Sequence, residues 1–364
     1  MLSIDLLSRG RDPGRPRDDA GLMPGAELSG LLRRSVPELA LGLWSLRTVE
    51  PLLTVPRGGQ RFTACVATWT DHCARADFTA ALVVKEDRKR VPRWADRAAR
   101  VLTASGLGAD AASRVAAPYG VCGPGALVSE RVEGLSLLAT VLAAPGPSAA
   151  ALAAERLATW LLHLQRSGAA LPSSSRRGLQ EAVPQLVEVA AAVGTRASGS
   201  LLAELAGELT ASSEATTVGA ALPSHGDLHP ANLFLAGACT VAIDLDTVAA
   251  REPAYDVGYA VCHLVVSSLL AGAPLEHAVA AAARCWDAYR RGGGVATDER
   301  IALQAARALV QSLHFELVTY ATGRAEVLEL WPRAALLLLQ HGRSGLDVLA
   351  DTSARELGQH EAAS

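Results

Sequence analysis

The spacing of apolar positions changes along the chain and predicts two regions of different secondary structure. Leucines at helical spacing over residues 28–45 are interrupted by Pro37, where we expect the helix to break. Residues 50–71 are typical of two short strands around a Gly58-Gly59 turn, and residues 78–86 of a third strand. A helix over 91–107 and a strand over 125–134 complete a small, mostly antiparallel region.

From Leu135 onward the pattern is mainly helical and rich in Ala and Leu, which places a boundary near Glu133. Two short strands, 232–237 and 240–246, interrupt the helices. Four more helices are expected after residue 254, one of them capped by Thr297. These patterns predict an α+β protein with three segments: a disordered leader (1–27), a small N-terminal antiparallel-sheet lobe (28–133) and a larger, mostly helical C-terminal lobe (134–364).

Composition excludes several classes of protein. Half of the 364 residues are hydrophobic and the formal net charge is -3, which argues against nucleic-acid binding. The six cysteines form no CxxC pair, and the N-terminus lacks a signal-peptide core, so we expect reduced thiols in the cytoplasm. The longest apolar run, 257–273, is too short for a membrane span and predicts a buried helix. The oligomeric state stays open.

The polar stretch "SHGDLHPANLF" (224–234) carries the candidate chemistry. Asp227 and Asn232 stand five residues apart in a loop, and Asp244 ends an apolar strand twelve residues later. Oxygen ligands from Asn232 and Asp244 suit Mg²⁺, which takes few protein ligands plus substrate phosphates. Asp227 would then be free to orient a hydroxyl and accept its proton, as phosphoryl transfer requires.

"HGDLHPANLF" followed by "AIDLDT" resembles the H-G-D-x-x-x-x-N loop and metal-binding Asp of the aminoglycoside phosphotransferase and choline kinase family. The order of elements is similar over roughly residues 48–345. The resemblance implies a bilobal, protein-kinase-like fold and O-phosphorylation that depends on ATP and Mg²⁺. It implies that Asp227 is the catalytic base, that Asn232 and Asp244 bind Mg²⁺, and that His225 fixes the loop.

The N-terminal lobe offers candidate nucleotide contacts. The period of two in "ALVVKE" places Val83 and Lys85 on one face of a strand, where Val83 would cover an adenine and Lys85 would reach the phosphates. The Gly58-Gly59 turn either approaches phosphates or is an ordinary hairpin turn. The inter-lobe hinge is expected to pair with adenine through the backbone of Ser129, Glu130 and Arg131.

Several positions vary from the family pattern or stay ambiguous. Asp256, in "EPAYDVGYA", is expected by resemblance to brace the catalytic loop. The helix after the lysine strand offers Asp96 where relatives carry a Glu that pairs with the lysine. Asp246 is a candidate for a second metal, for substrate, or for a solvent-facing strand end, and His229 for substrate contact or loop packing. Protein kinases often have Arg where this chain has Gly226.

The resemblance implies a phosphotransferase with a small-molecule hydroxyl substrate, in antibiotic resistance or natural-product biosynthesis. Aminoglycosides are polycationic and would meet an acidic cleft, for which we name a set of candidate acids: Asp246, Glu252, Glu316 and Glu326. Two alternatives stay open. One is a kinase of Ser or Thr in a biosynthetic peptide, and the other is a nucleotide-binding pseudokinase regulator, which the missing Glu and the sparse glycine loop would suit.

Overall fold

The structure is a computed structural model, and it describes residues 22–351 except 58–59, 88–92, 123–124, 175–177, 194–195, 323 and 325–326. The chain divides into two compact units. The first unit extends to Gly134 and also contains Phe234–Val248, whereas the second comprises Leu135–Leu233 and the residues from Ala249 onward.

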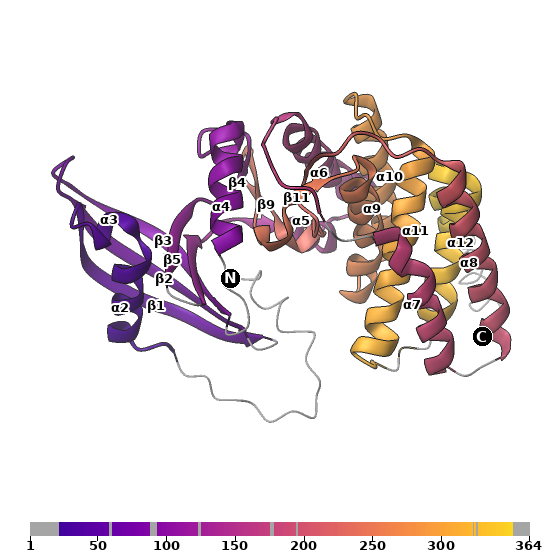
Figure 1. Cartoon of the computed structure of the whole chain (residues 1–364), viewed down its shortest axis with the longest axis horizontal. Coiled ribbons are helices and arrows are strands. Elements are labelled where there is room, and N and C mark those ends of the chain that lie inside the picture. Colours follow the sequence, from indigo (N-terminus) through magenta and orange to yellow (C-terminus); the bar gives the residue numbers. More distant parts are fainter. Residues whose placement is uncertain are drawn as a thin grey trace. The chain divides into compact units, whose positions relative to one another are not determined.

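A five-stranded antiparallel sheet forms most of the first unit (Figure 1). Its strands follow the order β1-β2-β3-β6-β5, with the bounds β1 Trp44–Arg57, β2 Gln60–Asp71, β3 Ala76–Asp87, β6 Ala126–Glu130 and β5 Pro118–Cys122. Helices α2 (Gly25–Ser35) and α3 (Pro37–Ala40) are separated by extended Val36, so the predicted break at Pro37 is real.

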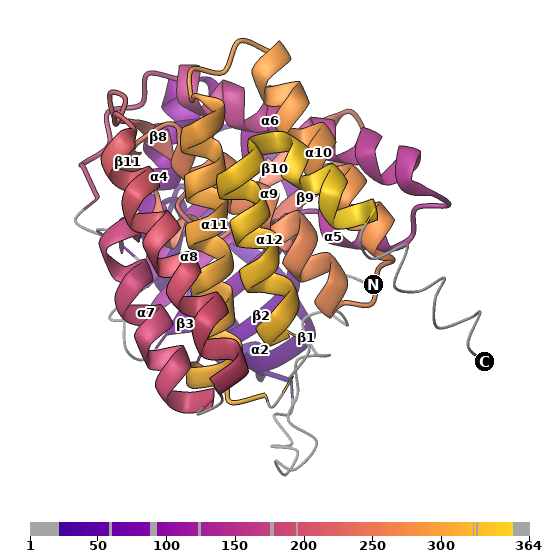
Figure 2. The ribbon, with the colours of Figure 1, turned by 90° about the vertical axis from the view of Figure 1, so that its right-hand side faces the viewer.

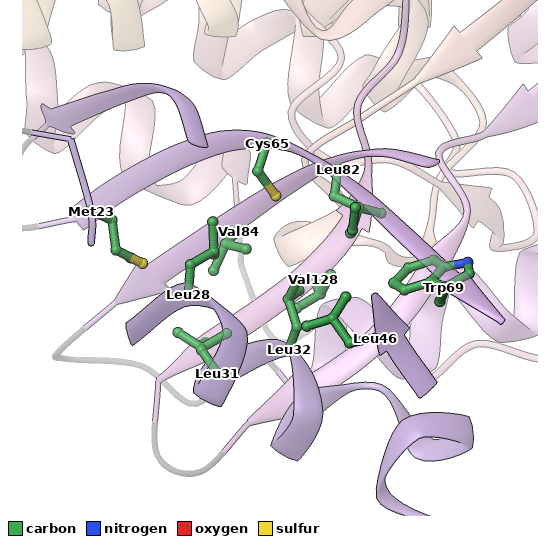
Figure 3. Packing of buried hydrophobic residues seen from close by; sticks show 12 residues of the cluster. Met23, Leu28, Leu31, Leu32, Leu46, Cys65, Trp69, Leu82, Val84 and Val128 are labelled. Atoms are coloured by element: carbon green, nitrogen blue, oxygen red, sulfur yellow. The ribbon is translucent and has the colours of Figure 1, made fainter. Parts of the chain in front are cut away.

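The core of this unit lies between the sheet and α2 (Figure 3). Leu82 and Val84 of β3 are fully buried there, together with Leu28 and Leu32 of α2. Because side chains alternate along a strand, Val83 and Lys85 lie on the opposite face of β3. Met23 is also buried in this core, so residues 22–27, which we expected in a disordered leader, belong to the first unit.

A second group of elements completes the first unit. Strand β10 (Cys239–Ala242) pairs in parallel with β4 (Ser113–Val115), and β9 (Leu233–Ala236) lies on the other side of β10. This pairing places Phe234–Val248 in the first unit, although we expected that segment in the C-terminal lobe. Nearby are helix α4 (Arg93–Leu102), the π-helical turn η1 (Thr103–Leu107) and the 3-10 turn η3 (Leu245–Thr247).

The second unit is mostly helical. Figure 2 shows α7, α8, α11 and α12 side by side. The α-helices of this unit are α5 Leu137–Leu142, α6 Pro147–Arg166, α7 Gly178–Val193, α8 Arg196–Ala215, α9 Ala254–Leu270, α10 Leu275–Arg291, α11 Asp298–His314 and α12 Val327–His341. Its shorter elements are β7 Leu135–Ser136, β8 Leu222–Ser224, β11 Ala249–Arg251, the 3-10 turns η2 Pro230–Asn232 and η5 Gly342–Ser344, and the π-helical turn η4 Phe315–Thr319.

Helix α9 is the central helix of this unit and covers most of the long apolar run. Most of its residues are buried, and at Gly258 an added Cβ would lie 2.6 Å from the backbone nitrogen of Ala305 in α11. Glycine therefore permits the close approach of α9 and α11. In the part of the chain that the structure describes, every helix is too short or too polar to cross a membrane.

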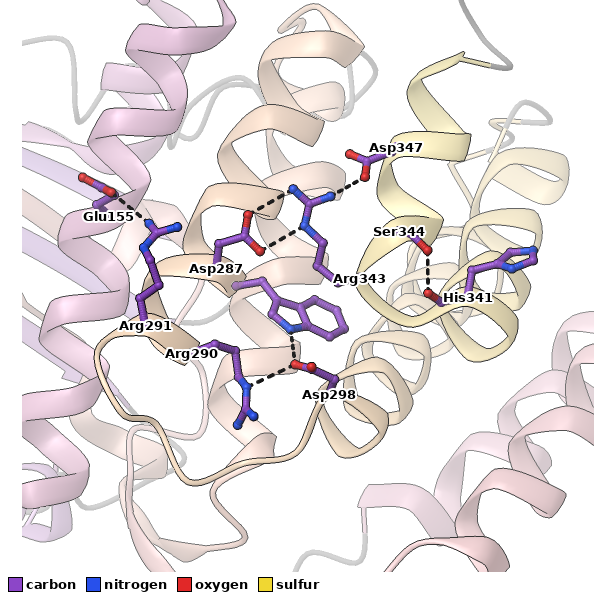
Figure 4. A network of polar contacts seen from close by, with 10 residues as sticks. Glu155, Asp287, Arg290, Arg291, Asp298, His341, Arg343, Ser344 and Asp347 are labelled. Carbon is purple, nitrogen blue, oxygen red and sulfur yellow. Dashed lines mark hydrogen bonds and ion pairs between the residues drawn. The ribbon is translucent and has the colours of Figure 1, made fainter.

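Charged side chains join α10, α11 and η5 (Figure 4). Trp286 donates its ring N–H to Asp298 at 2.8 Å, and Arg343 donates its Nε to Asp287 at 3.0 Å. The Thr297 side chain accepts a hydrogen bond from the backbone N–H of Arg300, which confirms the predicted helix cap. These contacts fix the ends of α10 and α11, the helices that pack against α9.

Candidate active site

The polar stretch that follows β8 is a loop with one 3-10 turn. Gly226 has a φ of 83°, a left-handed conformation that suits glycine and would strain the arginine that protein kinases often carry there. Extended His229 and Pro230 then start the single turn η2, which ends at Asn232. The mixture of Gly and Pro thus produces the irregular backbone that the sequence predicted.

Asp256 holds the start of this loop from the first turn of α9. Its two carboxylate oxygens accept the backbone N–H groups of His225, at 2.6 Å, and Gly226, at 2.8 Å. Asp256 is almost fully buried, so these two bonds offset the cost of removing its charge from water. The buried ring of His225 lies against Trp160, and its Nδ1 accepts the N–H of Asp227 at 3.3 Å. Together these contacts fix the position of the backbone at Asp227.

Asp227 and Asn232 are joined within the loop. The Asn232 side-chain amide donates its N–H to the backbone carbonyl of Asp227 at 3.0 Å, and the N–H of His229 donates to the same carbonyl at 3.0 Å. The amide nitrogen is therefore used within the loop, while the side-chain oxygen of Asn232 accepts no hydrogen bond from any described residue. That oxygen can serve as a ligand.

A tyrosine that sequence reasoning missed contacts the Asp227 carboxylate. The hydroxyl of Tyr259 donates to Oδ1 of Asp227 at 2.5 Å. Tyr259 lies one helical turn after Asp256 on α9, so the i, i+3 spacing in "DVGY" was the signal that could have identified it. Burial, and then the neighbouring charge of Asp227, raises the pKa of Tyr259 well above its usual range, which keeps the hydroxyl protonated.

Two histidines lie beside this tyrosine. The rings of His263 and Tyr259 have centroids 4.3 Å apart, and those of His229 and His263 lie 6.0 Å apart. Loss of hydration, followed by the neighbours His229 and Arg307, lowers the pKa of His263 to about 3. The ring of His263 is therefore neutral at physiological pH. His229 thus has the ring of His263, from α9, as a neighbour.

Within the first unit, two of the candidate acids, Asp244 and Asp246, lie beside Lys85. Its ammonium group lies 2.8 Å from Oδ1 of Asp244 and 2.6 Å from Oδ2 of Asp246. Burial alone would lower the pKa of Lys85, but the charges of the two aspartates outweigh it and raise the pKa. Asp244 has φ and ψ of 61°, a left-handed conformation uncommon for a residue other than glycine. Such strain clusters at functional sites.

Asp96, the acid expected where relatives carry the lysine-paired Glu, does not pair with Lys85 here. Asp96 pairs with Arg100, one turn later on α4, at 2.9 Å. Helix α4 itself is tied to the residues after Asp244 by Trp94, whose ring N–H donates to the carbonyl of Val248 at 3.0 Å. Asp246, not Asp96, is the acid that joins Asp244 on the ammonium of Lys85.

Two of the predicted hinge residues already use their backbone N–H groups in hydrogen bonds within the protein, which restricts their ability to bind adenine. Glu130 forms an ion pair with Arg114 at 2.6 Å and donates its backbone N–H to Ala117. Arg131 donates its N–H to the carbonyl of Ala81. An adenine contact through either of these two N–H groups is therefore excluded in this arrangement. Ser129 lies opposite Val83 in the sheet.

Gly58 and Gly59 lie outside the described residues, as does Glu326. The other acids expected to attract a polycation have protein partners. Glu252 forms an ion pair with the buried Arg300, and Glu316 accepts a hydrogen bond from Thr322 at 2.9 Å. Asp246 is occupied by Lys85. Two of the acids expected to attract a polycation, Glu252 and Asp246, therefore already have cationic partners within the protein.

Three solved structures share the fold of this chain. A choline/ethanolamine kinase family protein from Mesorhizobium loti has a TM-score of 0.53 at 15% identity, with 89% of this chain and 98% of that chain covered. A spectinomycin phosphotransferase in complex with ADP and spectinomycin has a TM-score of 0.53 at 11% identity, covering 91% and 99%. An aminoglycoside phosphotransferase in ternary complex with AMP-PNP and hygromycin B has a TM-score of 0.54 at 12% identity, covering 80% and 94%.

No curated protein matches the sequence. The sequence profile of the phosphotransferase enzyme family, in contrast, matches residues 58–294, which is well over half of the chain and includes the Asp227 loop and the Lys85 strand. The fold shared with the three solved kinases confirms the predicted α+β, protein-kinase-like class. The chain therefore belongs to the phosphotransferase enzyme family.

Proposed function

We propose that this protein transfers the γ-phosphoryl group of ATP to a hydroxyl of a small molecule, with Asp227 as the catalytic base. The observation that carries the proposal is the way the Asp227 loop is held. Asp256 fixes its backbone through two hydrogen bonds, and Asn232 ties the far end of the loop to the Asp227 carbonyl. A preorganised carboxylate of this kind is what general-base catalysis requires.

The reaction needs one proton transfer to the protein. The acceptor hydroxyl gives its proton to the Asp227 carboxylate while its oxygen bonds to the γ-phosphorus of ATP. The bond between that phosphorus and the β–γ bridging oxygen breaks, and ADP leaves with the electron pair. Asp227 therefore orients the acceptor and takes up the proton, and positioning supplies most of the rate enhancement.

Asn232 and Asp244 are proposed to hold Mg²⁺. Both offer hard oxygen donors: the side-chain oxygen of Asn232 has no described partner, and the Asp244 side chain is 38% exposed. When bound, Mg²⁺ neutralises the phosphate charge of ATP. In the described residues no group of three or more His, Cys, Asp or Glu side chains could hold a metal, so the remaining ligands would come from phosphates and water.

Lys85 and Val83 are the proposed nucleotide contacts of the first unit. In the protein without nucleotide, the Lys85 ammonium bridges Asp244 and Asp246. We propose that this ammonium turns to the α- and β-phosphates of ATP when Asp244 takes the metal, while Asp246 continues to hold it. Val83, on the same face of β3, would cover the adenine.

The acceptor is proposed to be an antibiotic or another natural product with few positive charges. The similar solved enzymes carry spectinomycin or hygromycin B. In this chain, however, Glu252 is already paired with Arg300, and the Asp227 carboxylate accepts the hydroxyl of Tyr259. Among the described candidate acids, fewer are therefore left to attract a strongly polycationic acceptor.

The test is phosphate transfer from Mg-ATP to a panel of aminoglycosides, spectinomycin, nucleoside antibiotics, amino alcohols and sugars, with ATP hydrolysis in water recorded alongside. Product mass is measured for the wild type, for Asp227→Asn, and for the control Asp110→Asn, which changes an exposed acid. We expect a gain of one phosphate that the Asp227 variant loses by at least about 100-fold and the control retains.

Transfer that persists in Asp227→Asn would contradict the assignment of the base. Binding of Mg-ATP by the wild type without transfer or hydrolysis would instead favour a regulator that binds nucleotide. Transfer to a serine or threonine peptide, and to no small molecule, would favour the peptide kinase.

A further inference from the structure

Two residues of α9 reach the catalytic loop from the same helix face. Asp256 binds the backbone of His225 and Gly226, and Tyr259, three residues later, donates its hydroxyl to Oδ1 of Asp227 at 2.5 Å. Residues three apart on a helix are neighbours on its surface. One helix therefore holds both the backbone of the loop and the carboxylate of its candidate base.

The position of the Tyr259 ring is fixed by its surroundings. Tyr259 is 7% exposed, and its ring lies parallel to that of Tyr255, at 3° and 6.5 Å between centroids. The guanidinium groups of Arg251 and Arg307 lie 4.9 Å and 4.6 Å from the centre of the Tyr255 ring. On its other side Tyr259 meets His263. The ring therefore has little freedom to turn its hydroxyl away from Asp227.

The hydrogen bond makes the two carboxylate oxygens of Asp227 unequal. Oδ1 accepts the Tyr259 hydroxyl, whereas Oδ2 accepts no hydrogen bond from the described residues. A phenol can donate only one proton, and it donates here to an anion, which makes the bond short and strong. Rotation of the carboxylate would break this bond, so the Oδ2 lone pairs keep one direction.

We propose that Tyr259 is a positioning residue for the base: it holds Oδ1 of Asp227 so that Oδ2 receives the proton of the acceptor hydroxyl. This inference rests on the proposed function of Asp227. Tyr259 does not take part in the transfer of the proton or of the phosphoryl group. It sets the orientation of the oxygen that does, and misalignment of a catalytic group by a fraction of an ångström is costly.

The test compares Tyr259→Phe with Tyr255→Phe in the full-length protein. Tyr255 is an ideal control because it lies one turn away in the same stack of rings and its hydroxyl has no hydrogen-bond partner in the described chain. Each variant loses one hydroxyl and keeps its ring. The rate of Mg-ATP hydrolysis, with water as the acceptor, gives kcat and the KM for ATP, and thermal unfolding gives Tm.

We expect Tyr259→Phe to lower kcat by about 10- to 100-fold, which is the range for loss of one hydrogen bond to a charged group. The KM for ATP stays within about twofold, since the nucleotide contacts proposed above lie in the other unit, and Tyr255→Phe keeps both parameters within about twofold. A purely structural role of the Tyr259 hydroxyl would lower Tm in Tyr259→Phe but not in Tyr255→Phe, and would leave kcat of the folded protein unchanged.

An unchanged kcat in Tyr259→Phe, or an equal loss in both variants, overturns the inference. Asp227→Asn separates this failure from failure of the proposed function. If Asp227→Asn is inactive and Tyr259→Phe is not impaired, only the role of Tyr259 is wrong. If Asp227→Asn hydrolyses ATP as fast as the wild type, the role of the base is wrong, and that of Tyr259 falls with it.

Discussion

At the residue scale, the contacts of Lys85 show which of the nearby acids pairs with its ammonium group. Sequence reasoning left Asp246 open between a second metal, a substrate contact and a solvent-facing end of a strand. The structure brings it within 2.6 Å of the Lys85 ammonium, while Asp96 pairs with Arg100. In protein kinases a Glu of the neighbouring helix pairs with this lysine. Here Asp246 supplies the negative charge that this Glu supplies in protein kinases.

Asp246→Asn is expected to raise the KM for ATP about fivefold, because Lys85 loses a charge-assisted hydrogen bond worth on the order of 1 kcal/mol. Asp96→Asn is the matched control and should stay within about twofold, since an exposed i, i+4 pair contributes little. Steady-state kinetics of Mg-ATP hydrolysis measures both. A larger effect in Asp96→Asn than in Asp246→Asn would return the lysine-pairing role to helix α4.

His263 is expected to make stability depend on pH. Its pKa is about 3 in the folded protein, against 6.5 for an ordinary histidine. Between these values the unfolded chain binds the extra proton, so the contribution is full above pH 6.5 and is lost as the pH falls toward 3. The free energy of unfolding should drop by up to about 2 kcal/mol from this residue between pH 7.5 and pH 5.

Urea unfolding at both pH values measures this effect in the wild type and in His263→Gln. The variant should lose less stability on acidification than the wild type does. His341→Gln, which changes an exposed histidine at the end of α12, should keep the wild-type difference. An identical pH response in wild type and His263→Gln would show that the folded protein accommodates the charged ring.

At the element scale, periodicity and capping identified the elements that neighbour the site. Alternation in β3 correctly placed Val83 and Lys85 opposite the core residues Leu82 and Val84. The long apolar run after Asp256 is the buried helix α9. Short elements such as β4 (Ser113–Val115) and α5 (Leu137–Leu142) were missed, because three to six residues do not establish a period.

Gly258 is the residue that lets α9 approach α11. Gly258→Ala should lower the free energy of unfolding by about 2 kcal/mol, since the new Cβ would lie 2.6 Å from backbone in α11 and the helices must separate. Gly207→Ala in exposed α8 is the control. Nothing lies within 4 Å of its added Cβ, so it should stabilise by about 0.5–1 kcal/mol. Urea unfolding distinguishes the two, and a stabilised Gly258→Ala would mean that α9 and α11 have room to move.

At the scale of the whole molecule, the chain passes from one unit to the other three times rather than once. The predicted boundary near Glu133 lies one residue before the end of the first segment of the first unit. The chain then returns to that unit for Phe234–Val248, because β10 finds its parallel partner in β4, more than a hundred residues earlier. This return carries Asp244 and Asp246 to Lys85. A boundary drawn from composition could not include it.

The sequence by itself determined the class of the fold and the candidate loop. Gly226 and Pro230 make the backbone of the loop irregular. The spacing of Asp227, Asn232 and Asp244 is a local pattern that can be identified in the sequence alone. Local periodicity likewise defined the long helices and the sheet strands, since it follows from geometry within one element.

Only the tertiary structure decided which groups meet. The contacts of Tyr259 with Asp227, of Asp246 with Lys85 and of Glu252 with Arg300 join residues 32, 161 and 48 positions apart. Such pairs depend on how elements pack and pair, so propensities within one segment do not establish them. For the same physical reason the loop of the proposed base was predictable from its own residues, whereas packing decided which side chain of the neighbouring helix contacts Asp227.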